Sequence, residues 1–280
     1  RKFFTHIRAE KLGFTIYKIY FKTKGLDKGQ EQELKNYFIS HPNVYRVATC
    51  DGIYDLIVSI TAKDVYQLYA MLQKCFQKYD ANFLSKDVTI STAIYHSRKE
   101  YIAGHEKDEL PPLFKGGEKG ALVLDDKDTE ILKIIANNAR TPVIEMAQRL
   151  GITSGAVIYR MKNLSKKGII SAYRCSINLE KIGYIFCKVF LSLNMDNIKK
   201  LKELHQFCLQ HPNIVMMIYC IGHWDFEIEL ETESMAVFHN LLKEIKTRFS
   251  DIIKNYESVI LSHEYKFDHF PECYPVIVKK

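Results

Sequence analysis

The stretch His41-Pro42-Asn43-Val44 returns 170 residues later as His211-Pro212-Asn213-Ile214, and both stretches belong to a longer repeat. The same offset relates, without a gap, Glu10-Lys11-Leu12-Gly13 to Glu180-Lys181-Ile182-Gly183, then Cys50, Gly52 and Asp55 to Cys220, Gly222 and Asp225, and finally Leu72, Ile90 and Tyr95 to Leu242, Ile260 and Tyr265. A constant offset over this distance predicts a duplicated domain. Because a solenoid needs more repeats than two, the pattern indicates a pair of globular modules.

Each copy follows the order strand, helix, strand, strand, helix, strand. Aromatic and β-branched residues favour a strand over 14–21, and apolar residues at helical spacing favour a helix over 28–40. Asp51-Gly52 predicts a hairpin turn. The remaining elements of the first copy are expected at 44–50, 53–60, 63–79 and 87–95, and those of the second at 184–193, 197–210, 214–221, 223–230, 234–249 and 254–265. This is the ferredoxin-like βαββαβ order, an α+β fold, and we expect the two sheets to pack on each other.

Composition divides the rest of the chain. Residues 98–123 contain Pro and Gly among mixed charges, which is typical of a linker. The predicted domains are therefore 1–97, a first βαββαβ unit; 98–123, a linker; 124–173, an inserted domain; 174–268, a second βαββαβ unit; and 269–280, a C-terminal tail.

Bulk properties are those of an ordinary globular protein, with 47% hydrophobic and 26% charged residues. Seven cysteines without a CxxC pair fit free thiols in a reducing compartment, and no apolar run is long enough to span a membrane. With no secretory signal in view, we expect a cytoplasmic protein with no cofactor. His205, Cys208 and His211 lie three residues apart on a helix and diverge around it, so no metal site is predicted.

The inserted segment 124–173 is predicted to be a winged helix-turn-helix. Asp125-Asp126 precedes a first helix; Thr141 caps and Pro142 begins a second, which ends at Gly151; Thr153 caps a third, which runs to Lys167. The strand that follows, 169–173, would form the wing. Such a domain places its third helix in the major groove of DNA.

The third helix is basic and contains no acidic residue. The predicted DNA contacts are Thr141, Thr153, Ser154, Gly155, Ile158, Tyr159, Arg160, Lys162, Lys166 and Lys167. We expect residues near the helix start to meet base edges and the lysines to meet phosphates. The alternative is an ordinary solvated helix end, because lysines near a helix C-terminus are favourable without DNA.

Residues 124–268 resemble the leucine-responsive, or feast/famine, family of transcription regulators (Lrp/AsnC). The resemblance rests on Leu124-Asp125-Asp126-Lys127-Asp128-Thr129-Glu130-Ile131-Leu132, Ala147-Gln148-Arg149-Leu150-Gly151-Ile152-Thr153, Val157-Ile158-Tyr159-Arg160-Met161-Lys162-Asn163-Leu164 and Lys167-Gly168-Ile169-Ile170. It implies a winged helix-turn-helix followed by an effector-sensing domain, assembly into homo-oligomers, and amino acids or related metabolites as effectors. Residues 7–97 resemble the sensing domain alone, so two sensing domains share one helix-turn-helix; a first one either was lost or lies upstream.

The hairpin residues Gly52, Asp55, Gly222 and Asp225 have two interpretations. Geometry alone favours a tight turn whose Asp holds loop amides, whereas the resemblance implies effector contacts at this turn. Asp225, Glu227, Glu229 and Glu231 alternate along one strand face. Such a face is most often solvated, but the first copy, which carries a net charge of +5, is an alternative partner.

We therefore predict a sequence-specific DNA-binding transcriptional regulator, not an enzyme, that binds double-stranded DNA and responds to a small metabolite. The chief alternative is an enzyme similar to tetrapyrrole-modifying decarboxylases, which would need a His and Tyr cluster in a cavity; His96, His223 and His263 are available but form no recognisable catalytic pattern. A third possibility is a metabolite-sensing co-regulator that does not bind DNA itself.

Overall fold

The structure, a computed structural model, describes residues 2–97, 112–117 and 122–274. The first βαββαβ unit consists of β2 (Thr15–Thr23), α1 (Lys28–Ser40), β3 (Val44–Gly52), β4 (Leu56–Ala62), α2 (Val65–Tyr79) and β5 (Phe83–His96). The second consists of β8 (Ile185–Leu193), α7 (Ile198–Gln210), β9 (Ile214–Ile221), β10 (Phe226–Thr232), α8 (Met235–Arg248) and β11 (Ile253–Phe267). Short 3-10 turns lie at Ala9–Leu12, Asp80–Asn82 and Glu180–Ile182. The predicted element order is confirmed in both halves.

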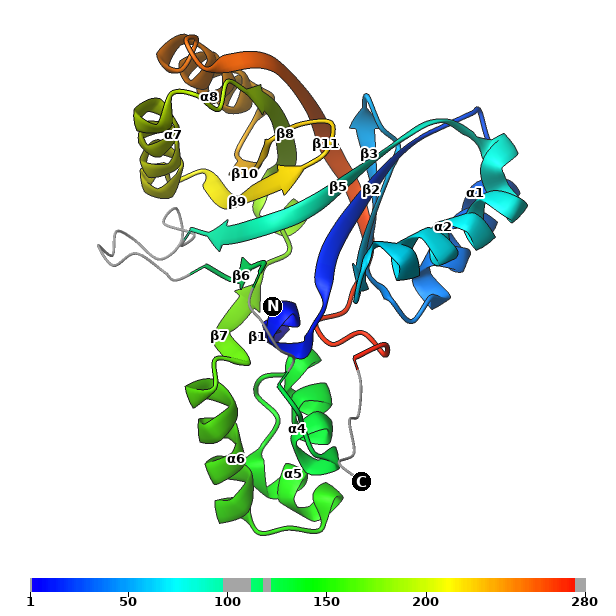
Figure 1. The fold of residues 1–280 in the computed structure, drawn as a ribbon, viewed down its shortest axis with the longest axis vertical. Coiled ribbons are helices and arrows are strands. Elements are labelled where there is room, and N and C mark those ends of the chain that lie inside the picture. Colours follow the sequence, from blue (N-terminus) through cyan, green and yellow to red (C-terminus); the bar gives the residue numbers. More distant parts are fainter. Residues whose placement is uncertain (1, 98–111, 118–121, 275–280) are drawn as a thin grey trace.

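Each unit has the ferredoxin-like strand order, β5-β2-β4-β3 in the first half and β11-β8-β10-β9 in the second. The two sheets are nevertheless joined, because β3 pairs with β11 and β5 pairs with β9. Eight strands therefore close into one barrel-like sheet, with the two helix pairs on opposite outer sides (Figure 1). The expectation of two separate sensing domains that flank the inserted domain is corrected in this respect.

The length of two strands explains the joined sheet. The early part of β11 pairs with β8 in its own half, and its later part, from Val259 onward, pairs with β3 of the other half. In the same way β5 pairs first with β2 and then, from Ile90 onward, with β9. Each strand thus leaves its own sheet and continues at the edge of the other, which leaves neither edge open at these seams.

Separate apolar cores lie beneath the two helix pairs. The first packs Leu34, Phe38, Leu68 and Leu72 against the outer face of the first half-sheet, and the second packs Leu204, Phe207, Leu241 and Ile245 against the other. The inner face of the barrel holds aromatic residues and buried charges. Successive strand residues alternate between these two environments because a strand has a period of two.

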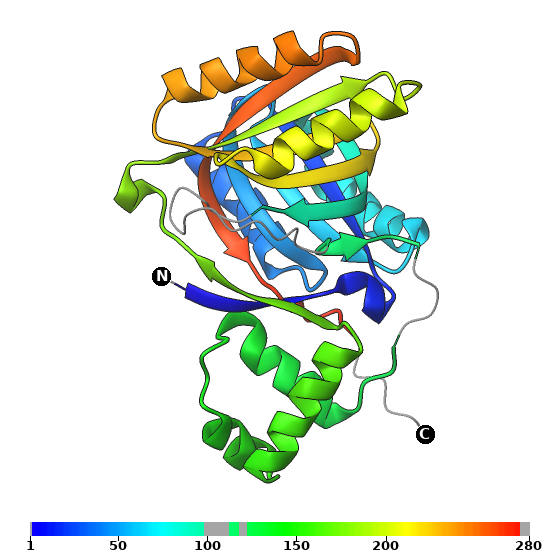
Figure 2. The same ribbon diagram turned by 90° about the vertical axis from the view of Figure 1, so that its left-hand side faces the viewer.

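The inserted domain lies beside the barrel, below it in the view of Figure 1. It consists of α4 (Asp126–Asn137), α5 (Val143–Leu150) and α6 (Ser154–Lys166), followed by β7 (Ile170–Ser176). Strand β7 does not form a wing within this domain: it pairs antiparallel with β1 (Lys2–Ile7), and the ribbon so formed lies between the barrel and the three helices (Figure 2). The strand predicted after the third helix is therefore present, and its pairing partner comes from the N-terminal segment.

Two segments with loop composition take part in the fold. Residues of the predicted linker form β6 (Phe114–Lys115), which pairs with β5, and Leu113 and Phe114 are buried. In the predicted tail, Phe270 and Tyr274 are buried against the same region. The rest of the linker, 98–111 and 118–121, and the end of the tail, 275–280, lie outside the described residues.

Candidate functional site: a cavity beside the helix-turn-helix domain

A cavity opens between the β1–β7 ribbon and one end of the barrel. Its volume is about 130 Å³. The lining is mainly apolar and aromatic, with Phe4, Ile94, Phe114, Phe267 and Tyr274 among its walls. An apolar cavity with a few polar groups is the usual form of a small-molecule site.

The polar lining is rich in basic and imidazole side chains, namely His6, His96, His269, Lys18, Arg46 and Arg174, with Glu229 and Asp268 as the acids. The ring of His269 stacks on Phe4 with centroids 3.8 Å apart. A guanidinium nitrogen of Arg174 lies 2.9 Å from Nδ1 of His96. The same Nδ1 lies 2.5 Å from the carbonyl of Ser97, so one tautomer satisfies only one of these two contacts.

Two of the histidines are held neutral at physiological pH. Burial, with a contribution from Arg174, lowers the pKa of His6 to about 3. Burial, with a contribution from Lys2, lowers the pKa of His269 to about 4. A neutral imidazole accepts a hydrogen bond or a metal ion through its free nitrogen and is a poor proton donor. The cavity therefore offers acceptors beside the positive charge of Arg174.

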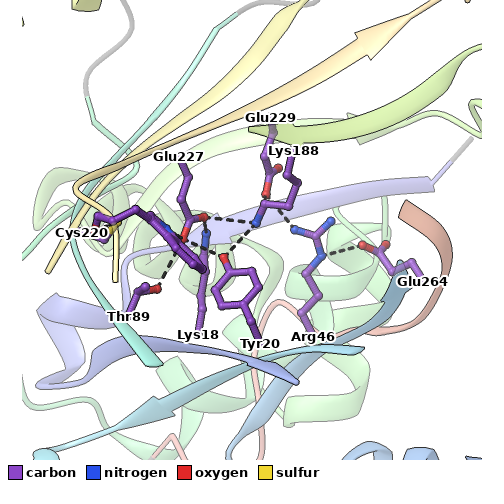
Figure 3. A network of polar contacts seen from close by, with 10 residues as sticks. Lys18, Tyr20, Arg46, Thr89, Lys188, Cys220, Glu227, Glu229 and Glu264 are labelled. Atoms are coloured by element: carbon purple, nitrogen blue, oxygen red, sulfur yellow. Dashed lines mark hydrogen bonds and ion pairs between the residues drawn. The ribbon is translucent and has the colours of Figure 1, made fainter. Parts of the chain in front are cut away.

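Deeper in the barrel, charges of the two halves form a buried network (Figure 3). Nζ of Lys18 lies 2.6 Å from a carboxylate oxygen of Glu227, and a guanidinium nitrogen of Arg46 lies 3.1 Å from Glu229. Lys188 lies between the two acids, 3.2 and 3.1 Å from them. The prediction of a solvated acidic face is wrong, and the alternative of a basic partner in the first copy is confirmed.

Strand β1 connects the cavity to the helix-turn-helix domain. Phe4 and His6 line the cavity. On the other side of the strand, the Thr5 hydroxyl donates a hydrogen bond of 2.8 Å to the carbonyl of Ile135 in α4. The amide of Ala139 donates to the carbonyl of Phe3, and the Arg140 guanidinium lies 3.6 Å from the centre of the Phe3 ring. Alternate residues of one strand thus contact the cavity and the domain.

A second connection runs through the segment after β11. Asp268 lines the cavity and accepts a 2.8 Å hydrogen bond from the side-chain amide of Asn137, the last residue of α4. The amide of His269 donates to the other side of the same Asn137 amide group. Strand β1 and the segment after β11 therefore both contact the C-terminal part of α4.

The third helix is built as predicted at its ends. The Thr153 hydroxyl accepts a hydrogen bond from the Ala156 amide and caps α6. Gly151 ends α5 in the left-handed conformation. Thr141, in contrast, does not cap α5: its hydroxyl donates to the Asn138 carbonyl, and Pro142 occupies the N-cap position.

The basic residues of α6 fall into two groups. Lys162, Lys166 and Lys167 are exposed, as are Ser154, Gly155, Ile158 and Tyr159. Arg160 instead holds the start of α4, with guanidinium contacts of 2.6 Å to Asp125 and 2.7 Å to Asp128. Its role in attracting phosphate stays a prediction, and a phosphate there would compete with these two carboxylates of its own domain.

The predicted effector residues lie at the seams of the barrel. Asp55 accepts hydrogen bonds from the Thr23 amide and hydroxyl, and Asp225 accepts one from the Leu193 amide. A Cβ atom on Gly52 would lie 2.9 Å from the Ser258 carbonyl oxygen, and one on Gly222 would lie 2.6 Å from that of Val88. These contacts favour the structural interpretation: the carboxylates hold loop groups and the glycines admit the crossing strand.

Of the three histidines that line the cavity, one was among the candidates that the sequence suggested. His96 lines the cavity, whereas His223 contacts Asp87 at the surface and His263 is exposed beside Tyr265. His6, His269 and Arg174 were missed because the ribbon and the C-terminal segment bring them together, and no spacing in the sequence signals this. In the described residues, no three His, Cys, Asp or Glu side chains are placed to hold a metal ion, and no helix has the length and apolar character to cross a membrane.

Comparisons with known proteins agree with the two structural parts. Residues 124–171 match the winged helix-turn-helix DNA-binding family. The chain is 29% identical over 140 residues to the regulatory protein AsnC of Haemophilus influenzae, across 49% of this chain and 90% of that protein. It is 47% identical over 62 residues to the transcriptional regulator LrpA of Pyrococcus horikoshii, across 22% of this chain and 44% of that protein.

Among solved structures, that of a siroheme decarboxylase resembles nearly the whole chain. The siroheme decarboxylase NirDL, in complex with an iron-uroporphyrin III analogue, superposes with a TM-score of 0.65 across 98% of this chain and 81% of its own. Identity is 12%, so this likeness establishes the shared fold alone. The winged helix-turn-helix match and the similarity to these two regulators support a relationship of this chain to the leucine-responsive (Lrp/AsnC) family of transcription regulators.

Proposed function

We propose that the protein is a DNA-binding transcriptional regulator whose affinity for DNA responds to a small organic acid, such as an amino acid, bound in the cavity beside β1. The observation that carries this proposal is the double role of β1, which lines the cavity with Phe4 and His6 and holds α4 through Phe3 and Thr5. A ligand that displaces either face of a single strand must shift the other. Two sites and one connecting element are what allosteric control requires.

The cavity chemistry favours a carboxylate with an apolar or aromatic body. The Arg174 guanidinium and the imidazoles of His6 and His269 line the cavity together with aromatic rings such as those of Phe114 and Tyr274. A guanidinium pairs with a carboxylate through two parallel hydrogen bonds. The aromatic walls would bury the rest of the ligand.

On the DNA side, α6 would enter the major groove with Ser154, Gly155, Ile158 and Tyr159 near the base edges. The exposed amines of Lys162, Lys166 and Lys167 would contact phosphates, which position the protein without reading sequence. Homo-oligomers would space several such helices by about one turn of the duplex. The hairpins with Gly52, Asp55, Gly222 and Asp225 remain a prediction for additional effector contacts.

Selection of duplexes from a random DNA pool, at two salt concentrations, tests the DNA-binding part. Enrichment of a spaced, roughly palindromic site would support a regulator and define its assembly. The absence of binding at both salt concentrations would contradict it and favour the co-regulator.

The response to ligand is tested with a panel of amino acids and their 2-oxo acids. Binding is read by the shift in Tm and its effect by DNA affinity. Arg174→Met should abolish both the Tm shift and the effect on DNA. Thr5→Val should keep the Tm shift and lose the effect on DNA. If Thr5→Val leaves the effect intact, β1 does not carry the coupling.

The cavity histidines support a second candidate, an enzyme acting on a tetrapyrrole carboxylate. His6, His96 and His269 line a cavity in a chain whose fold resembles the siroheme decarboxylase throughout. The neutral imidazoles of His6 and His269 suit an iron ligand or a base better than an acid, because their pKa values are low.

Addition of siroheme to the purified protein separates the candidates. A shifted absorbance band that His269→Ala abolishes, followed by loss of carbon dioxide detected by mass spectrometry, would establish the enzyme. Siroheme that binds, stays intact and changes DNA affinity would instead make the tetrapyrrole the effector of a regulator.

A further inference from the structure

The charges buried inside the barrel are distributed unequally between the two halves. The strands of the first half contribute Lys18 and Arg46, 3% and 8% exposed, and no buried acid. The second half contributes Lys188 together with Glu227, Glu229 and Glu231, all at most 5% exposed. The inner face of the first half therefore carries a net charge of +2 and that of the second half −2.

The repeat shows which positions differ. Lys18 and Lys188 are equivalent at the offset of 170, so one cation is shared. At the positions equivalent to the three acids, the first half has Ile57, Ser59 and Thr61. At the position equivalent to Arg46, the second half has Met216. The difference in net charge between the two inner faces thus arises at four pairs of equivalent positions.

The backbone pairing at the seams does not by itself distinguish an unlike half from a copy of the same half as the partner. Ile260 pairs with Asp51 at one seam, and the equivalent residues Ile90 and Ile221 pair at the other. His263 with Thr49 and Ala93 with Tyr219 are again equivalent pairs. The two seams share this register up to Glu264 in β11 and Ile94 in β5, beyond which they differ by one residue; over the shared stretch each half could by its backbone alone pair with a copy of itself. The choice between a like and an unlike partner half must therefore depend on the side chains.

From this we infer that the buried charges select the unlike pairing, so that the barrel forms from one first half and one second half and not from two like halves. A pair of first halves would bury four cations with no acid inside. A pair of second halves would bury two cations and six acids. Burying unpaired charge is strongly unfavourable, because the lost hydration is not replaced.

The contacts of Glu227 show how specific the fit is. Its carboxylate receives Lys18 at 2.6 Å and the Tyr20 hydroxyl at 2.7 Å from the first half, and Lys188 at 3.2 Å and the Trp224 indole nitrogen at 3.1 Å from its own half (Figure 3). The position equivalent to Tyr20 is Phe190, which has no donor. In a like pair of second halves a second Lys188 would take the place of Lys18, but Phe190 would replace Tyr20 and its hydroxyl donor would be lost.

The unlike pairing also makes the lining of the cavity beside β1 asymmetric. Equivalent positions line it with unlike residues: Phe4 faces Arg174 across the ribbon, and Arg46 is matched by Met216. A like pair would place the same residue on both sides. The unlike pair thus brings apolar and basic residues from equivalent positions together in one cavity.

The test uses the folded chain with a protease site inserted between residues 97 and 112. The chain is cleaved after folding, unfolded in urea, refolded by dilution and weighed by native mass spectrometry, which distinguishes the three possible pairs by mass. We expect unlike pairs almost alone. Recovery of like and unlike pairs in random proportion would overturn the proposal.

Two variants test whether charge or shape selects the partner half. Glu227→Ile with Glu229→Ser places the first-half residues in the second half, and we expect the share of second-half pairs to rise at least tenfold. Glu203→Gln removes an exposed acid from α7 and should change nothing. Unchanged selectivity in the double variant would show that shape, not charge, chooses the partner.

If the cleaved fragments refold poorly, a measurement on the uncleaved chain tests the same proposal. Lys18→Met and Glu227→Gln should each lower Tm, and the double variant should lower it by clearly less than the sum. Strict additivity would mean that the two charges do not recognise each other across the interface, which contradicts the proposal.

Discussion

At the scale of single residues, the lysines of α6 are distinguished from Arg160 by their partners. Arg160 is neutralised by Asp125 and Asp128, whereas Lys166 is exposed at the end of the helix. Only an unneutralised amine releases counterions from DNA. Sequence alone ranks these basic residues together, since the carboxylates that pair with Arg160 lie more than thirty positions away.

We predict that Lys166→Ala weakens DNA binding to a similar degree for all sequences and reduces the slope of log affinity against log salt by about one. Filter binding or fluorescence anisotropy at several salt concentrations measures both. Lys133→Ala, on α4 and paired with Glu130, is the matched control and should leave the slope unchanged. Loss of affinity for one site only would contradict the phosphate assignment.

His6 should make the folded state sensitive to mild acid. Burial lowers its folded pKa from 6.5 to about 3, so the neutral form stabilises the fold above pH 6.5 and this contribution is lost as the pH falls towards 3. Between pH 7.5 and 5 we expect the free energy of unfolding to fall by about 1 to 2 kcal/mol more in the native protein than in His6→Gln. Urea titrations at the two pH values measure the difference; equal losses would contradict it.

At the scale of elements, β1 is the strand that ties the helix-turn-helix to the barrel. Thr5 is fully buried and its hydroxyl bonds the Ile135 carbonyl. We expect Thr5→Val, which keeps the shape, to cost about 1 kcal/mol. Hydrogen exchange should show faster opening of α4 and unchanged exchange in α7. The exposed Thr247→Val on α8 is the isosteric control, and equal exchange of α4 in both variants would exclude the coupling.

The seams of the barrel should tolerate no side chain at Gly222. An added Cβ would lie 2.6 Å from the Val88 carbonyl oxygen and 2.9 Å from the Thr89 methyl carbon, so β5 and β9 would have to separate. We predict that Gly222→Ala destabilises the protein by more than about 2 kcal/mol. Gly25→Ala meets no atom within 4 Å and should be nearly neutral. Thermal unfolding of the two variants shows whether Gly222 lies at a closely packed seam or in an ordinary turn.

At the scale of the whole molecule, the buried network predicts a second loss of stability in stronger acid. Burial raises the pKa of Glu227, but Lys18 and Lys188 outweigh it and lower the pKa from 4.5 to about 2. The stabilisation is complete above pH 4.5 and disappears as the pH falls to 2. Between pH 4.5 and 3 we expect the native protein to lose about 2 kcal/mol more than Glu227→Gln. Parallel curves for the two proteins would show that the pair does not stabilise the fold.

The outlines of the elements followed from the sequence because they depend on near neighbours. The helix that begins after Thr153 and the turn at Gly151 were predicted to within a residue, since caps and left-handed glycines act locally. Strand β7 was also expected, but its partner was not. Pairing of β7 with β1 joins residues about 170 apart, and no local pattern specifies it.

The sequence by itself determined the duplication, the two βαββαβ units and the helix-turn-helix, because periodicity, caps and turns are written in neighbouring residues. Only the tertiary structure decided that β5 and β11 cross between the halves, that Arg160 is neutralised, and that His6, His96, His269 and Arg174 share a cavity. It also turned the acidic face of β10 inward to meet Lys18 and Arg46. The physical reason is that burial, and the pairing of charges it enforces, depends on which distant surfaces meet.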